Sequence, residues 1–250
     1  EVEVAKRIEK GNADLIDIFS DSKLVLLYLQ NLTKQLKNKK IKTRYVISGL
    51  DEDDNVIEDE DKSTVNLIAQ FDVLWKHHRS MNKFRKHQAK RKLQPAEKKR
   101  LEESESLFKD AICNINFNSR QIELMCDEIL NHKEKINLTF RKMNSNIKSL
   151  ELPVEKMDQL FKQLSSATSK KDKEKTAKDI SAQTGHRFSI ANRYFEKIEL
   201  NRKSISTMIE LTTLSLDDFN LEIKSLKQVE RKVKSAKSQL VEANLRLVIS

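Results

Sequence analysis

Histidine, cysteine and acidic side chains are the groups from which this chain could build a metal site or a catalytic site. His77 and His78 are adjacent, so on a helix they point about 100° apart and do not easily share one metal ion. Cys113 and Cys126 fall in different expected helices, and neither an HExxH nor a CxxC pattern occurs. We therefore expect solvated histidines and two buried, free thiols, and we predict no metal.

Nucleophile and phosphate-loop motifs are also missing from the sequence. No GxSxG elbow is present, and three glycines in 250 residues cannot form a glycine-rich phosphate loop. Carboxylates are numerous, but they fall on charged helical faces or in one acidic run. We predict no catalytic residue, no cofactor and no small-molecule substrate, and we expect that the chain is not an enzyme.

A strongly basic stretch points to an anionic partner. The net charge is +10, and from Lys76 to Arg100 eleven Lys or Arg stand against one acid. Such a run can neutralise nucleic-acid phosphates, but a solvated helical face has the same composition, and both interpretations stay open. The weak candidates for this contact are Lys83, Arg85, Lys86, Lys90 and Arg91.

The segment 51–61, DEDDNVIEDED, has the opposite character, with eight acids and no base. Its charges repel one another and it has little apolar surface to bury, so we expect a disordered loop. It could mimic nucleic acid or bind a basic partner, although such tracts are more often solvating linkers.

Composition predicts the fold class. Only three Gly and two Pro occur, 34% of the residues are charged and 6% are aromatic, which indicates an all-α fold: an irregular bundle of long amphipathic helices. The clearest apolar stripes, with spacings of three and four, lie within 122–150 and 219–247. Further helices are expected at 2–18 with a weak point at Gly11, at 24–36, from Ser63 onward, after Pro95, at 154–164 and at 188–214. The polar tract 165–175 is expected to be a connector. The expected core face after Ser63 consists of Val65, Ile68, Phe71 or Val73, and Trp75.

The cellular compartment can be predicted from simple features. No run of about 20 apolar residues is present, so no membrane contact is expected. The start, EVEVAKRIEKG, is too charged for a signal peptide, and free cysteines fit a reducing cytoplasm. The chain also lacks an initiator Met and stops without a helix cap at LVIS, so we expect an internal fragment of a cytoplasmic protein.

Two segments at opposite ends resemble conserved parts of one family. VEANLRLVIS (241–250), after the basic run RKVKSAKSQL, resembles the start of the second region of bacterial primary (housekeeping) sigma factors, where a basic run leads into AK-x-x-x-VEANLRLV. EVEVAKRIEKG (1–11) resembles the segment just upstream, where E-x-E-hydrophobic-A-K-R-I-E-x-G recurs. Lys10 departs from that pattern, because many members have an acid there. The two matches cover about thirty of the 250 residues.

The resemblance implies three parts: the end of a conserved upstream helix at 1–20, a non-conserved helical insert at 21–215, and the start of the region-two helix at 216–250. It also implies a transcription initiation factor that regulates transcription by recognising promoters. Its partners would be the RNA polymerase core enzyme and promoter DNA, whose non-template single strand it captures during melting.

The resemblance further places Glu1, Asn244 and Leu247 in a DNA-binding pocket for a flipped promoter base. A carboxylate can accept from the ring N–H of thymine, an amide can donate and accept at a base edge, and leucine can pack on the base face. Arg246 is a possible contact to the adjacent phosphate. Asn244 and Leu247 share a helix face, but Glu1 can join them only if the first helix packs against the last.

A second interpretation, from another class, stays open. The chain would then be a helical structural or scaffold protein whose basic face binds nucleic acid or an acidic partner. In that case Asn244 is a capping or surface amide and Leu247 belongs to the core.

Overall fold

The computed structural model describes residues 2–49, 57–88, 90–167 and 169–249, without the side chains of 57–61, 161, 244 and 246–249. Within these ranges the chain is helical and has no strand, so the predicted all-α class is confirmed. The helices are α1 (Val2–Asp21), α2 (Lys23–Lys37), the short 3-10 helix η1 (Thr43–Tyr45), α3 (Ile57–Gln88), α4 (Pro95–Cys113), α5 (Ser119–Lys148), α6 (Val154–Ser166), α7 (Lys170–Thr184), α8 (Phe188–Thr212) and α9 (Leu216–Ile249).

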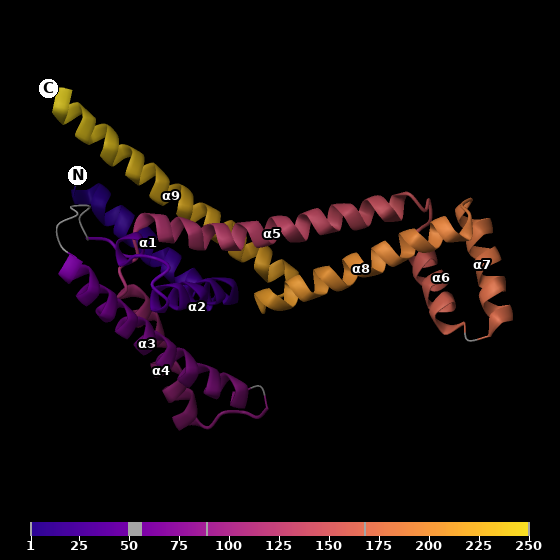
Figure 1. Ribbon diagram of the computed structural model, residues 1–250, viewed down its shortest axis with the longest axis horizontal. Coiled ribbons are helices and arrows are strands. Elements are labelled where there is room, and N and C mark those ends of the chain that lie inside the picture. Colours follow the sequence, from indigo (N-terminus) through magenta and orange to yellow (C-terminus); the bar gives the residue numbers. More distant parts are fainter. Residues whose placement is uncertain (1, 50–56, 89, 168, 250) are drawn as a thin grey trace. The chain divides into compact units, whose positions relative to one another are not determined.

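The helices form two compact units. Unit 1 comprises residues 1–130 and 216–250, and unit 2 comprises residues 131–215. Unit 1 therefore contains α1 to α4, the start of α5 and α9, whereas unit 2 contains the rest of α5 and α6 to α8 (Figure 1). This division follows packing. The predicted segments 1–20, 21–215 and 216–250 follow the family resemblance and stay a prediction.

The core of unit 1 is built from the apolar stripes of its helices. Its fully buried large side chains include Leu15, Phe19, Leu29, Leu36, Leu67, Phe71, Leu74, Met81, Phe108, Ile112 and Phe219. The core face expected for α3 was wrong in part, because Val65 and Val73 are 69% and 49% exposed. The buried positions Leu67, Phe71 and Leu74 follow the spacing of four and three that defines one helical face, and the two valines lie off that face.

Two segments that composition predicted as irregular contain helix. α3 begins at Ile57, so the expected loop 51–61 was wrong for residues 57–61, while residues 50–56 lie outside the described part. Acids in the first turns of a helix are favoured by its dipole, and the run EDED at 58–61 stands there. Likewise, α7 begins at Lys170 inside the expected connector 165–175. The hydroxyl of Ser169 caps it by accepting from the Asp172 N–H at 3.1 Å.

Unit 2 has its own core. It consists of Leu150, Met157, Leu160, Ile180, Ala191, Phe195 and Ile198, all buried. The helix expected near 188–214 is present as α8, and Pro153 directly precedes α6. Gly185, with φ +67°, ends α7 in the left-handed conformation that glycine adopts without strain. Unit 2 is thus a bundle of helices around one apolar cluster.

Candidate functional site

Helices α1 and α9 pack against each other within unit 1 (Figure 1). The guanidinium of Arg7 donates to the side-chain carbonyl of Gln239, 232 positions away in the sequence, at 2.5 Å. Four residues further along α1, Gly11 is buried against Val233. Facing positions therefore rise in α1 as they fall in α9, which makes the pair antiparallel. The packing that the predicted pocket requires is present between described residues.

Gly11 sets how closely the two helices approach. A Cβ atom added to Gly11 would lie 2.3 Å from Cγ2 of Val233, well inside van der Waals contact. The helix runs through this glycine without a break, although glycine weakens a helix interior. The side chain of Val233 fills the space that a Cβ atom at this position would take, which is a packing reason for a glycine inside this helix.

The predicted pocket residues lie at the edge of the described structure. Glu1 lies outside it. Asn244, Arg246 and Leu247 belong to α9 by their backbone, and their side chains lie outside the described part. Contact between Glu1 and Asn244 or Leu247 therefore stays a prediction. Among the neighbouring described side chains, Val241 and Leu245 are 57% and 55% exposed, one helical turn apart.

Carboxylates gather near the other end of the α1–α9 pair. Glu222 of α9 has one side-chain oxygen that is buried and has no hydrogen-bond partner among the described atoms. Burial, followed by the charge of Asp21, raises the pKa of Glu222 to about 7. Sequence patterns did not single this residue out, because the signal is its environment and not its spacing.

Ion pairs connect the end of α1 to the α3–α4 hairpin. Lys109 lies 3.1 Å from Asp17, and Arg85 lies 3.7 Å from Asp21. These side chains are largely exposed, so each pair contributes little to stability. Their effect is to fix which faces of the helices meet.

A small cavity lies between α1, α5 and α9. Its lining includes Asn12, Cys126, Val233 and Glu230, and its volume of about 40 Å³ suits only a water molecule or two. The Asn12 side-chain oxygen is buried there without a described partner, which fits a bridging water. Burial raises the pKa of the Cys126 thiol to about 12, so this cysteine is a protonated core residue and not a nucleophile. The expectation of two buried thiols was wrong for Cys113, which is exposed.

The basic candidates divide into two groups. Arg85 donates twice to Glu105, at 3.1 and 2.8 Å, and Arg91 donates to both oxygens of Glu97, at 2.9 and 2.7 Å. Their guanidinium groups are therefore engaged within the hairpin. The other candidates, Lys83, Lys86 and Lys90, are exposed, and none forms an ion pair with a described residue.

The histidine pair has a structural explanation. The ring of His78 is half-buried between the rings of Trp75 and Phe108, with centroids 5.6 and 5.4 Å away. Burial, and then the charge of Arg85, lowers the pKa of His78. The Trp75 N–H donates to the Thr33 hydroxyl at 3.1 Å. His78 is thus a packing residue, contrary to the expectation that both histidines are solvated.

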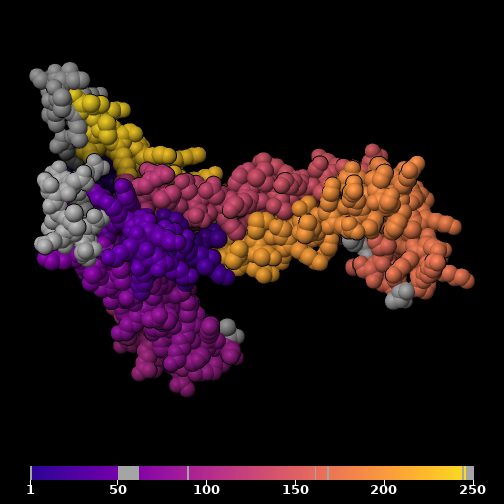
Figure 2. Space-filling model, in the orientation of Figure 1, coloured from indigo at the N-terminus to yellow at the C-terminus, as the bar shows by residue number. Residues whose placement is uncertain are grey.

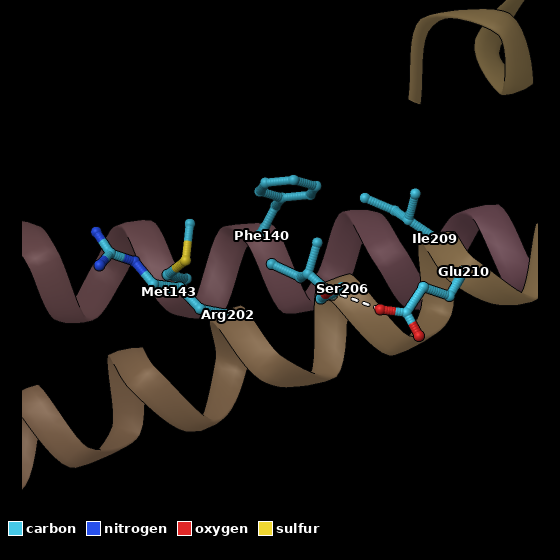
Figure 3. A pocket seen from close by; sticks show the side chains of 7 residues that line it. Phe140, Met143, Arg202, Ser206, Ile209 and Glu210 are labelled. Carbon is cyan, nitrogen blue, oxygen red and sulfur yellow. Dashed lines mark hydrogen bonds between the residues drawn. The ribbon is translucent and has the colours of Figure 1, made fainter. Parts of the chain in front are cut away.

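A groove on unit 2 offers an apolar floor between α5 and α8 (Figure 3). Its volume is about 350 Å³, and it is lined by Phe140, Met143, Arg202, Ile205, Ser206, Ile209 and Glu210. Arg202 pairs with Asp158 at 2.6 Å, and Glu210 accepts from the Ser206 hydroxyl at 3.2 Å. Most of the lining is apolar, and both of its charged side chains already take part in an interaction within unit 2.

Two classes of feature are missing from the described part of the chain. Over these residues, no three His, Cys, Asp or Glu side chains come together in a group that could hold a metal ion. Over the same residues, no helix combines the length and apolarity needed to cross a membrane.

Comparison with known proteins does not identify the chain. No protein-family model matches it, and no curated protein matches it. The resemblance of the two chain ends, together with the packing of α1 on α9, is therefore the basis on which a function can be proposed.

Proposed function

We propose that this chain is part of a bacterial primary sigma factor, and that it captures the non-template strand of melted promoter DNA within RNA polymerase. The observation that carries the proposal is the antiparallel contact of α1 with α9. The two segments that resemble the family are separated by more than 200 residues, yet their helices are packed together. The proposed pocket requires this arrangement, because Glu1 and Asn244 belong to opposite ends of the chain.

The register of the two helices supports the same conclusion. Arg7 faces Gln239 and Gly11 faces Val233, so a step of four residues toward the start of α1 corresponds to a step of six residues toward the end of α9. Two straight helices in this register bring the first turn of α1 beside the turn of α9 that contains Asn244. The proposal thus extends the observed register by about one and a half turns, from the Arg7–Gln239 pair to Glu1 and Asn244.

The chemistry of the proposed pocket suits a thymine that has left the base stack. The Asn244 amide would bond the base edge, Leu247 would pack on the base face, and the Glu1 carboxylate would accept from the ring N–H. Arg246 would hold a neighbouring phosphate. A carboxylate is otherwise unfavourable beside DNA, because phosphates repel it.

The test uses the full-length protein assembled with core RNA polymerase and a promoter with a pre-melted bubble. Asn244→Ala should weaken binding of the bubble by about 5- to 150-fold, since a good side-chain pair to a base contributes about 1–3 kcal/mol. Asn144→Ala is the matched control, because Asn144 is an exposed amide of α5 in unit 2. An abasic site at the captured position should remove the difference between wild type and Asn244→Ala.

Two outcomes would contradict the proposal. One is equal bubble binding by wild type and Asn244→Ala. The other is failure of the full-length protein to bind core polymerase, which would favour a structural or scaffold protein. A loss of binding in Asn144→Ala equal to that in Asn244→Ala would show that the effect is not specific to the pocket.

A further inference from the structure

Helix α3 carries a row of cations along one face. Lys76, Arg79, Lys83 and Lys86 follow one another at spacings of three, four and three, so they stand on one side of the helix. All four are exposed. Lys90, two residues beyond the end of the helix, is exposed as well. We call the four helical residues the cationic ridge.

The ridge points away from α4. Residues of α3 that meet α4 include His78, which stacks on Phe108, and Arg85, which bonds Glu105. Met81, between them on the same face, is buried. On a helix of 3.6 residues per turn the ridge lies on the side opposite this contact face. Figure 2 shows the α3–α4 hairpin as a projection of unit 1.

The ridge is not neutralised by the protein. None of its four cations forms an ion pair with a residue that the structure describes, whereas other cations of unit 1 do, such as Lys37 with Asp72 at 2.7 Å. The outer side of α4 mixes signs, since Lys98, Lys99 and Arg100 precede Glu102 and Glu103. Like charges three and four residues apart destabilise a helix. We expect a face that is only solvated to carry both positive and negative side chains, as the outer side of α4 does.

We propose that the cationic ridge binds the phosphate backbone of duplex DNA without reading its sequence. Lys76 and Lys86 are ten residues apart, which is about 15 Å along the helix axis. Each strand of a duplex places a phosphate about every 3.4 Å along its axis, so the ridge spans about four phosphates. Lysine and arginine contacts to phosphates position a protein on the duplex and carry no sequence information.

The surroundings of the ridge favour DNA over a protein partner. Protein interfaces centre on buried aromatic or other large anchors. The Phe and Trp side chains nearest the ridge in sequence, Trp75 and Phe84, are both half-buried, and the Trp75 N–H is already bonded to Thr33. Among the described residues, no exposed large apolar side chain is thus interleaved with the four cations. This inference is independent of the proposed sigma-factor role.

The test compares two variants with the same loss of charge. The ridge variant combines Lys76→Gln, Arg79→Gln, Lys83→Gln and Lys86→Gln. The control combines Lys170→Gln, Lys171→Gln, Lys173→Gln and Lys175→Gln, which are exposed positions of α7 in unit 2. Glutamine keeps the helix propensity of lysine. Binding of a short mixed-sequence duplex is measured by fluorescence anisotropy from about 50 to about 200 mM salt.

Each phosphate contact contributes about one unit to the slope of log affinity against log salt. The ridge variant should therefore have a slope shallower by about four, and the control a slope changed by less than one. Equal slopes in the two variants, or an unchanged slope in the ridge variant, would overturn the proposal. The proposal would also be overturned if the ridge variant lost binding to polyglutamate but bound DNA as well as wild type does. If the fourfold variant loses its helical circular dichroism, the single substitutions at positions 79 and 83 should each lower the slope by about one.

Discussion

Replacing Gly11 by alanine tests whether the contact between α1 and α9 is as close as the structure has it. The new Cβ would meet Cγ2 of Val233 at 2.3 Å, and the next nearest atom, Cβ of Val233, lies at an ordinary 3.7 Å. A single methyl group therefore opposes the substitution. The helices would have to separate by about 1.5 Å at this point to restore carbon–carbon contact, or the side chain of Val233 would have to rotate about χ1, which is restricted for β-branched residues in a helix.

Two opposing effects decide the stability of Gly11→Ala. Overpacking a well-packed contact costs about 1–3 kcal/mol. Alanine in place of glycine in a helix interior gains about 1 kcal/mol. The free energy of unfolding should thus fall by about 0–2 kcal/mol in Gly11→Ala. With Val233→Ala in the background, the opposing methyl is gone, and the same substitution should raise the free energy of unfolding by up to about 1 kcal/mol.

The assay is urea unfolding followed by tryptophan fluorescence. Trp75 is the only tryptophan of the chain and belongs to unit 1, so its signal reports the unit that contains Gly11 and Val233, separately from unit 2. A change of sign between the two backgrounds is the expected result. If Gly11→Ala is equally stabilising in both backgrounds, the two helices do not touch at this point, and the closeness of the chain ends loses its support.

Two further predictions follow from perturbed groups. In wild type, the free energy of unfolding should fall as the pH rises from about 4.5 to about 7, because the pKa of Glu222 is about 7 in the folded state and its ordinary value is 4.5. Glu222→Gln should not show this fall. In that pH window the unfolded chain binds fewer protons than the folded protein, so raising the pH favours unfolding. The urea midpoints of wild type and Glu222→Gln between pH 4 and 8 measure the effect. Parallel curves for the two proteins would refute the prediction. In native protein at pH 8, a thiol reagent should modify the exposed Cys113 and leave Cys126 unmodified, whereas urea should release both thiols. Equal rates at the two cysteines in native protein would contradict the buried position of Cys126.

The sequence predicted the helical architecture well where apolar spacing was long and regular. The stripe that begins at Ile122 and Met125 and the stripe that begins at Phe219 both face a core. Polar segments were harder to predict. The basic start of α7 looks like a linker in composition, but Thr176, Ile180 and Thr184, four residues apart, are buried. A stripe of one isoleucine and two threonines is too weakly apolar to stand out in the sequence.

The basic region shows a limit of a different kind. Counting charges selected Lys83, Arg85, Lys86, Lys90 and Arg91 as one group, but the structure engages Arg85 and Arg91 in ion pairs across the hairpin. It leaves Lys83 and Lys86 on the outer face with Lys76 and Arg79. Pairing across a helical hairpin depends on which faces meet. Hence the sequence identifies a run of cations, but which of them share an exposed face can be assigned only once the packing of the partner helix is known.

The α1–α9 contact and the cationic ridge belong to the same unit but depend on different parts of it. The register of α1 and α9 is set by Gly11, Val233 and the Arg7–Gln239 bond. The ridge is oriented by the stacking of His78 on Phe108 and by the Arg85–Glu105 pair. Substitutions more than about 10 Å apart without shared partners usually act additively. Asn244→Ala and the ridge substitutions change none of the residues in these contacts, so loss of strand capture in Asn244→Ala should leave the salt dependence of duplex binding intact, and loss of the ridge should leave the selectivity for the captured base intact.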